Sequence, residues 1–248
     1  MKKYEDIVYA DRKECILDVY IPDCEKFPVF VYFHGGGLES LDKKFDKFYE
    51  NLVSKGVAIV TADYRMYPNA KFPDFLVDSA EAVSWAYKNM SKYGEVTGYF
   101  VGGSSAGGYI SQMLCFDKQY LAKHGIDADK VDGYVLDAGQ PTVHFNVLRE
   151  RGLDTRRVIV DEASALYHIT ADRDYAPMQI IYSEFDMENR PEQTRLLCST
   201  LKHFGYAEKI DLRFMEKSGH CEYVNKQDEN GNWIFADMVY EFISNLSK

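Results

Sequence analysis

The residues best suited to chemistry in this chain lie in one short segment, Gly103-Ser104-Ser105-Ala106-Gly107. A serine with glycines two positions before and after it forms a sharp turn between a strand and a helix, and this turn exposes the serine hydroxyl. The N-terminus of the following helix contributes free N–H groups and a positive dipole where negative charge would develop. The segment therefore predicts a nucleophilic serine.

Two adjacent serines compete for this role. Ser105 has glycine at both flanking positions of the pattern, whereas Ser104 would have Ala106 in place of the second glycine. A Cβ at either glycine position would collide with the neighbouring strand or helix, so both glycines are needed. We therefore predict Ser105 as the nucleophile.

A second glycine-rich segment, His34-Gly35-Gly36-Gly37, directly follows the apolar run 28–33. Three successive glycines let the backbone approach a substrate closely and direct N–H groups into a site, with the Ala106 N–H as a partner. Alone, the segment would be interpreted as a flexible turn. Together with the downstream serine motif, it predicts an oxyanion hole.

A base is expected after the nucleophile, at the end of a strand. Of six histidines, His220 alone lies at the end of a predicted strand downstream of Ser105. A neutral imidazole there could accept the serine proton at neutral pH. The alternative is a solvated loop histidine. The other five lie elsewhere: His34 in the glycine motif, His124 in a polar loop, His203 in a predicted helix, and His144 and His168 in the segment 138–177.

An acid is expected between the serine and the histidine. Asp186 leaves the predicted strand 178–182 and could hold the histidine tautomer and stabilise the imidazolium. Glu184 and Glu188 are nearby rivals, and an ordinary surface carboxylate is the alternative interpretation of Asp186. An ordered set of serine, acid and histidine, each after a different strand, predicts a catalytic triad of Ser105, Asp186 and His220.

Short apolar runs alternate with helical patterns along the whole chain. This alternation predicts an α/β fold with a mostly parallel eight-stranded sheet and helices on both faces. Helices are expected over 75–90, from Asn189 and Pro191 to Gly205, and over 233–246, with a further one after the serine motif. Strands are expected at 6–10, 15–21, 28–33, 57–62, 99–101, 131–137, 178–182 and 210–214.

The segment 138–177 fits this pattern poorly, because it has no clean strand and only broken helical periodicity. We expect one domain over residues 1–248, with 138–177 as a lid-like insertion. One interpretation of its side chains is an apolar wall with a cationic group for an acidic or polyhydroxylated part of a substrate. The simpler interpretation is that these side chains form a basic surface exposed to solvent. The residues concerned are His144, Phe145, Leu148, Arg149, Arg151, Leu153, Arg156, Arg157 and Tyr167.

Charge and cysteine content narrow the class of protein. A formal net charge of -10 disfavours nucleic acid or an anionic membrane as partner, since both would repel the chain. Five cysteines without a CxxC pair favour neither a disulfide framework nor a zinc knuckle. The first residues lack the apolar region of a secretory signal, and no stretch approaches the roughly 20 apolar residues of a membrane helix. We expect a cytoplasmic protein without metal or cofactor.

These motifs resemble those of the α/β-hydrolases, in particular the hormone-sensitive-lipase-like and small microbial carboxylesterase branches. The resemblance covers the chain from about residue 28 onward and rests on HGGG at 34–37, DYR-x-x-P at 63–68 and GxSAGG at 103–108. It implies a triad of Ser105, Asp186 and His220. It also implies that the N–H groups of Gly36, Gly37 and Ala106 form the oxyanion hole. Members hydrolyse short acyl esters, including aryl esters and acetylated or feruloylated sugars, without a cofactor.

Two departures from the resemblance concern the surroundings of the site. Ser104 stands where this branch often has Asp or His, and HGGG begins too early for N-terminal cap helices. Because fold does not determine substrate, the sequence assigns no substrate-binding residue.

The expected function is hydrolysis of short-chain or aryl carboxylic esters, including acetyl or feruloyl esters of sugars, through an acyl-enzyme on Ser105. The expected partner is a small-molecule ester. The alternatives are an arylformamidase-type amidase and a non-catalytic binding protein with this fold. The sequence leaves the oligomeric state open, a homodimer included.

Overall fold

The computed structural model describes residues 1–247, and one eight-stranded sheet forms its centre. The strands lie in the order β1-β2-β4-β3-β5-β6-β7-β8. The pairs β1–β2 and β2–β4 are antiparallel, and the remaining five pairs are parallel. The predicted mostly parallel eight-stranded sheet is confirmed. The strands are β1 (Lys2–Val8), β2 (Ile16–Ile21), β3 (Lys26–Phe33), β4 (Ala58–Ala62), β5 (Glu95–Ser104), β6 (Gly133–Asp137), β7 (Met178–Phe185) and β8 (Ile210–Gly219).

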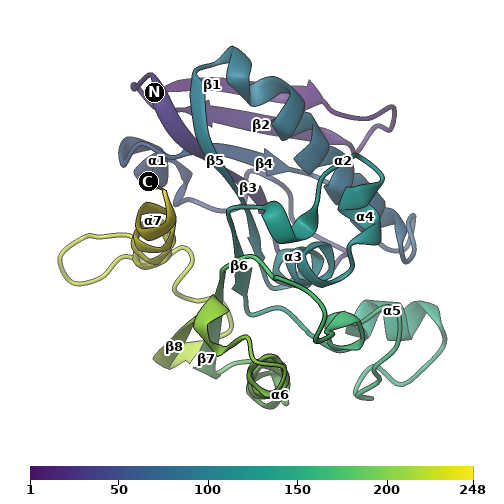
Figure 1. Ribbon diagram of the computed structural model, residues 1–248. Helices are drawn as coiled ribbons and strands as arrows, with labels where there is room; N and C mark the ends of the chain where they lie inside the picture. The colour runs from purple at the N-terminus through teal and green to yellow at the C-terminus, as the bar shows by residue number, and fades with distance from the viewer. Residues whose placement is uncertain (248) are drawn as a thin grey trace.

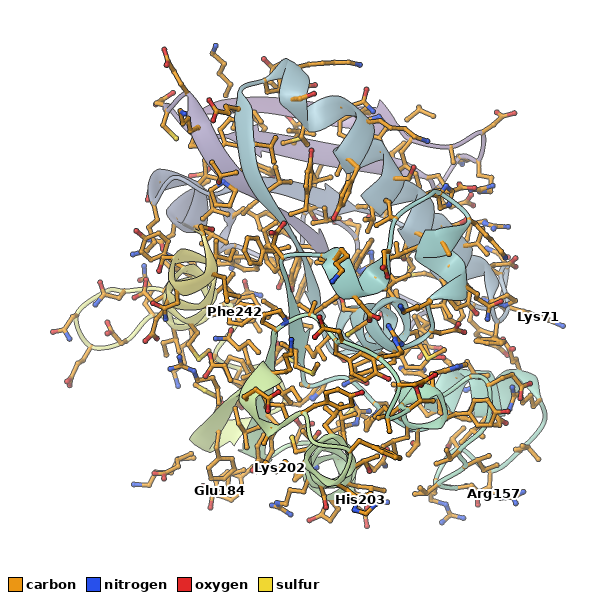
Figure 2. All side chains as sticks on the ribbon, viewed as in Figure 1. Lys71, Arg157, Glu184, Lys202, His203 and Phe242 are labelled. Atoms are coloured by element: carbon orange, nitrogen blue, oxygen red, sulfur yellow. The ribbon has the colours of Figure 1, made fainter. Side chains whose placement is uncertain are left out.

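Helices cover both faces of the sheet (Figure 1). One apolar core lies between the sheet and α2, α3 and α6, and a second lies between the sheet and α1 and α7. Phe242 of α7 points into the second core, as Figure 2 shows, and its ring lies 6.3 Å from that of Phe100. The helices are α1 (Tyr49–Ser54), α2 (Asp74–Asn89), α3 (Ala106–Phe116), α4 (Gln119–Ala122), α5 (Phe145–Glu150), α6 (Arg190–His203) and α7 (Ile234–Leu246).

The central strands are apolar on both faces because helices cover both faces of a parallel sheet. All five residues of β4 are buried, and so are the last five of β3. These runs were therefore easy to predict. The edge strands differ: β1 begins at Lys2 and consists mostly of exposed residues, while β8 extends to Gly219 through an alternating, largely polar sequence. Polar edge strands carry little apolar signal.

Strand β5 is longer than predicted, since it runs over 95–104 rather than 99–101. Its polar first half pairs with the start of β3, where Lys26 lies opposite Glu95. Pairing with a neighbouring strand thus overrides local composition. The short helices α1, α4 and α5 were not predicted, because helices of one or two turns depend on tertiary packing rather than on periodicity.

The segment 138–177 contains no strand within the described chain, as expected. It holds α5 and one 3₁₀ turn, η3 (Ala165–His168), and runs beside α3 and α6 in Figure 1. Arg157 lies at its outer margin and points away from the sheet (Figure 2).

The parallel half of the sheet determines where the predicted triad lies. Ser105, Asp186 and His220 each directly follow the last residue of a strand, namely β5, β7 and β8. These strands run parallel, so their carboxyl ends lie along one edge of the sheet. That edge is where open α/β sheets place their ligands.

The turn from β5 into α3 requires glycine. A Cβ on Gly107 would lie 1.9 Å from the carbonyl oxygen of Phe33, and a Cβ on Gly103 would lie 2.5 Å from both that oxygen and the Gly107 carbonyl carbon. Backbone atoms cannot move aside as a flexible side chain can. The two glycines therefore permit the close approach of β3, β5 and α3 at the site.

We predict that Gly107→Ala lowers the free energy of unfolding by about 3 kcal/mol or more, measured by urea denaturation, because the core backbone must shift. Gly125→Ala is the control, since Gly125 has a φ of +74° and an added Cβ there would have no atom within 4 Å. It should lose only about 1–2 kcal/mol from backbone strain. Equal losses in the two variants would contradict the close approach.

Candidate active site

The structure brings the three predicted triad residues into contact. The imidazole of His220 lies between the other two, with Nε2 2.8 Å from Ser105 Oγ and Nδ1 2.5 Å from Asp186 Oδ1. The Asp186 side chain is fully buried, whereas the His220 ring is 24% exposed. The rival acids lie elsewhere: Glu184 accepts a hydrogen bond from the Lys217 N–H, and Glu188 is exposed.

The backbone of Ser105 is held in a strained conformation with φ +57° and ψ −112°. Its N–H donates to the carbonyl of Asp137 at 2.9 Å, and its carbonyl accepts from the N–H of Tyr109 at 2.9 Å. A non-glycine residue with positive φ costs energy, which the surrounding structure must supply. This turn presents the Ser105 hydroxyl at the end of the sheet.

The glycine loop lies against Ser105. A Cβ on Gly35 would come within 3.3 Å of the Ser105 Cβ, and Gly36 and Gly37 have φ of +99° and +66°. Within residues 1–247, the N–H groups of Gly36, Gly37 and Ala106 donate no hydrogen bond to another protein group. Unpaired N–H groups at such a position can bind a developing oxyanion.

His34 orders this loop and does not act as a base. Its ring is fully buried, stacks on Tyr64 with 4.6 Å between centroids, and places Nδ1 2.8 Å from the Gly35 carbonyl oxygen. The Tyr64 hydroxyl donates to the His34 carbonyl at 2.8 Å. Burial lowers the pKa of His34 to about 4, so the ring is neutral at neutral pH.

A buried arginine that the sequence reasoning missed lies beside the triad acid. Arg190 donates from Nη1 to the Ala138 carbonyl at 2.6 Å and from Nη2 to Gln140 Oε1 at 3.2 Å. Burial lowers its pKa, and the charge of Asp186 acts in the opposite direction. A buried guanidinium without a nearby anion would cost folding free energy, and Asp186 is the anion close to Arg190. Arg190 is the first residue of α6, and nothing in the sequence indicates that a side chain at this position is buried.

Helix α5 contacts the glycine loop, which the sequence reasoning also missed. The Asn146 amide donates to the Gly37 carbonyl, and a Cβ on Gly37 would lie 3.0 Å from the Phe145 ring. Arg149 pairs with Glu39 at 2.6 Å. The segment 138–177 therefore helps to hold the loop that carries the candidate oxyanion donors. No motif or periodicity in the sequence indicates that Asn146 would contact Gly37.

Two clefts adjoin the site. One of about 320 Å³ includes Ser105 and His220 and has apolar walls from Leu41, Phe45 and Val224. The other, of about 360 Å³, lies between 138–177 and the start of α6. Its lining combines apolar surface with polar side chains, three of them arginines. Phe145 and Met187 place it next to the glycine loop and Asp186. The lining residues are Gln140, Phe145, Thr155, Arg156, Arg157, Met187, Glu188, Asn189, Arg190 and Gln193.

Four arginines of 138–177 are exposed, namely Arg149, Arg151, Arg156 and Arg157, whereas the Arg173 side chain is 9% exposed and pairs with Asp129. Arg156 is 87% exposed and pairs with Asp154 at 2.6 Å. Across the described residues, no group of three or more His, Cys, Asp or Glu side chains is placed to hold a metal ion. None of the helices described is both long and apolar enough to span a bilayer.

A serine after β5, an acid after β7 and a histidine after β8 of a mostly parallel sheet define the α/β-hydrolase fold. Within this class, the chain belongs to the BD-FAE family, whose model matches residues 17–146.

Known proteins agree with this assignment. The chain is 26% identical to probable carboxylesterase 1 of Arabidopsis thaliana over 155 residues, which cover 53% of this chain and 48% of the relative. It is 26% identical to esterase LipC of Mycobacterium tuberculosis over 221 residues, which cover 79% and 54%. The chain thus spans about half the length of these curated relatives.

Among solved structures, a truncated form of a carbohydrate esterase from gut microbiota superposes with a TM-score of 0.80. The match covers all of this chain and 96% of that one at 16% identity. A likeness at this identity supports the fold.

We predict that a fluorophosphonate probe labels Ser105 in the native protein, because His220 is positioned to remove the hydroxyl proton during attack on phosphorus. Peptide mass spectrometry should locate the adduct on Ser105, and His220→Ala should label far more slowly. Labelling of Ser104 instead, or an unchanged rate in the His220 variant, would contradict the geometry.

Proposed function

We propose that this protein is a serine hydrolase that cleaves small carboxylic esters by way of an acyl-enzyme on Ser105. The observation that carries the proposal is the position of the His220 ring, 2.8 Å from the Ser105 hydroxyl and 2.5 Å from the Asp186 carboxylate. Relatives named carboxylesterase and esterase support the same reaction class.

In the first half-reaction, His220 Nε2 accepts the proton of Ser105 as Oγ attacks the ester carbonyl. The carbonyl oxygen gains negative charge and is stabilised by the N–H groups of Gly36, Gly37 and Ala106, at roughly 3 kcal/mol per donor. Asp186 keeps the proton on Nδ1 and stabilises the imidazolium. The tetrahedral intermediate then collapses, and the alcohol leaves with the proton from His220.

The second half-reaction repeats these steps with water. His220 removes a proton from water, the hydroxyl attacks the acyl-enzyme carbonyl, and the Ser105–acyl bond breaks. The proton returns from His220 to Ser105 Oγ as the carboxylic acid forms.

The two clefts suggest a substrate class: short-chain or aryl esters, including acetyl or feruloyl esters of sugars. The cleft at Ser105 has apolar walls from Leu41, Phe45 and Val224, which suit a short acyl chain or an aromatic ring. The second cleft carries amide and guanidinium groups beside its apolar surface, and these groups could bind the hydroxyls of a sugar. A structural neighbour described as a carbohydrate esterase supports this assignment.

We predict that Ser105→Ala lowers kcat for p-nitrophenyl acetate by about 10⁴-fold or more, since the covalent route is lost. The matched Ser104→Ala variant should stay within about tenfold of the native kcat, because Ser104 makes no hydrogen bond to His220 and cannot replace the nucleophile. The release of p-nitrophenolate is measured after circular dichroism confirms that both variants fold. Turnover by Ser105→Ala close to that of the native protein would exclude this nucleophile.

A second prediction concerns the loop that carries the oxyanion donors. Asn146→Ala should lower kcat about tenfold with little change in KM, because the Gly37 carbonyl loses its hydrogen bond and the donors lose alignment. Asn89→Ala is the matched control, since the Asn89 amide donates to the Trp85 carbonyl at 2.8 Å, away from the site. The same kcat in both variants would show that α5 does not position the loop.

A further inference from the structure

We propose that Asp137 is a positioning residue of this active site, which fixes the His220 loop relative to the Ser105 turn. The inference rests on the proposed function and extends it to a buried carboxyl without a role in the steps above. Asp137 ends β6, and the β5–β6 register places it directly beside Ser104. Its side chain is fully buried.

The backbone of Asp137 supports the nucleophile. Its carbonyl oxygen accepts the Ser105 N–H at 2.9 Å, the hydrogen bond that holds the strained turn. A Cβ on Gly108 would lie 2.2 Å from the same oxygen, so α3 begins in contact with Asp137. The end of β6 and the turn of β5 therefore form one rigid unit.

The carboxyl of Asp137 reaches the loop that carries the base. The Tyr223 hydroxyl donates to Oδ1, and Cys221 Sγ lies 4.0 Å from Oδ2 and 3.8 Å from His220 Nε2. Residues 220–225 belong to neither a helix nor a strand, and their backbone hydrogen bonds, such as that from the Val224 N–H to the Cys221 carbonyl, stay within the loop and its immediate neighbours. Side-chain contacts therefore connect this loop to the sheet. Cys221 and Tyr223, which follow His220 in this loop, thus both contact the Asp137 carboxyl.

A second set of polar contacts connects the Ser105 turn to the other end of the His220 loop. Ser104 is the β5 residue paired with Asp137, and its hydroxyl lies 3.0 Å from the Tyr32 hydroxyl. Tyr32 donates to Asp46 Oδ2 at 2.8 Å, and the Asn225 amide donates to Asp46 Oδ1 at 2.9 Å. The His220 loop is therefore bound at both of its ends through buried polar groups.

This arrangement gives a reason for one departure noted in the sequence. Ser104 stands where similar enzymes often have Asp or His, and it cannot supply a charge. In this chain a carboxyl lies one strand away, at the residue paired with Ser104. A carboxyl group is thus present in the site, but on β6 instead of β5.

Retaining this carboxyl costs stability at alkaline pH. Burial raises the pKa of Asp137 to about 7, and the nearby charges of Asp186 and Asp46 add to the effect. The pKa of Asp137 is therefore higher in the folded protein than in the unfolded chain. The protonated carboxyl contributes its full stability below about pH 4, and this contribution is lost as the pH rises through about 7. An uncharged residue would avoid this loss.

The titratable groups near the Asp137 carboxyl come from each neighbouring element. Tyr223 and Cys221 lie on the His220 loop, and Asp186 follows β7. Asp46 and Tyr32 lie on the far side of Ser104. Arg190 is the nearby cation, and the charge of Asp186 acts to raise its pKa against the effect of burial. Tyr223 carries the direct hydrogen bond and is therefore the group to test.

The test compares Tyr223→Phe and Asp137→Asn in the full chain, with p-nitrophenyl acetate as substrate. Tyr223→Phe should lower kcat about tenfold and leave KM within about twofold, because the His220 loop loses its anchor. Asp137→Asn should also be slower, yet melt no lower than the native protein at pH 8. Tyr134→Phe is the control: Tyr134 lies on the same strand, and its hydroxyl donates to the Ala128 carbonyl at 3.0 Å.

Native kcat in both Tyr223→Phe and Asp137→Asn would overturn the positioning role. So would a loss of kcat in Asp137→Asn that accompanies a lower melting temperature at pH 8, since that pattern indicates a structural residue. The proposed function fails separately, when Ser105→Ala retains activity. An inactive Ser105→Ala variant together with an unaffected Tyr223→Phe variant would reject only the role of Asp137.

Discussion

The site depends on one strained backbone turn. Ser105 has a positive φ, and only glycines at 103 and 107 allow β3, β5 and α3 to approach closely enough to hold it there. The strain is offset by the buried parallel sheet and by the hydrogen bond from the Ser105 N–H to Asp137. Once the serine is fixed at the carboxyl end of β5, the neighbouring strands β7 and β8 supply the acid and the base from the same edge.

Buried charge is the second feature that shapes the site. Asp186 and Asp137 lie within one buried region together with Asp46, and Arg190 is the buried cation that faces Asp186. Each buried carboxyl costs folding free energy unless it is paired or hydrogen-bonded. Proteins retain such groups where function requires them, and here they surround the loop that carries His220. Stability and the alignment of the base are therefore in competition.

Much of the site could be predicted from the sequence, because its signals are local. The glycine motifs identify Ser105 and the loop at 34–37, and the order of strands restricts Asp186 and His220 to strand ends. The contacts that align these residues are not local. Asn146 binds Gly37, Arg190 lies beside Asp186, and Tyr223 binds Asp137, each through side chains whose burial no spacing reveals. The same reason explains the edge strands: polar sequence at β1 and β8 carries little pattern until pairing partners are known.

The most direct test of the covalent route is the mass of the protein itself during turnover. The protein is mixed with p-nitrophenyl acetate, quenched in acid within the first turnovers and analysed by intact-mass and peptide mass spectrometry. We expect one acetyl group per chain, located on the peptide that contains Ser105, together with a matching burst of p-nitrophenolate. Ester hydrolysis without any covalent adduct, or with acetyl on a different residue, would contradict a nucleophilic Ser105.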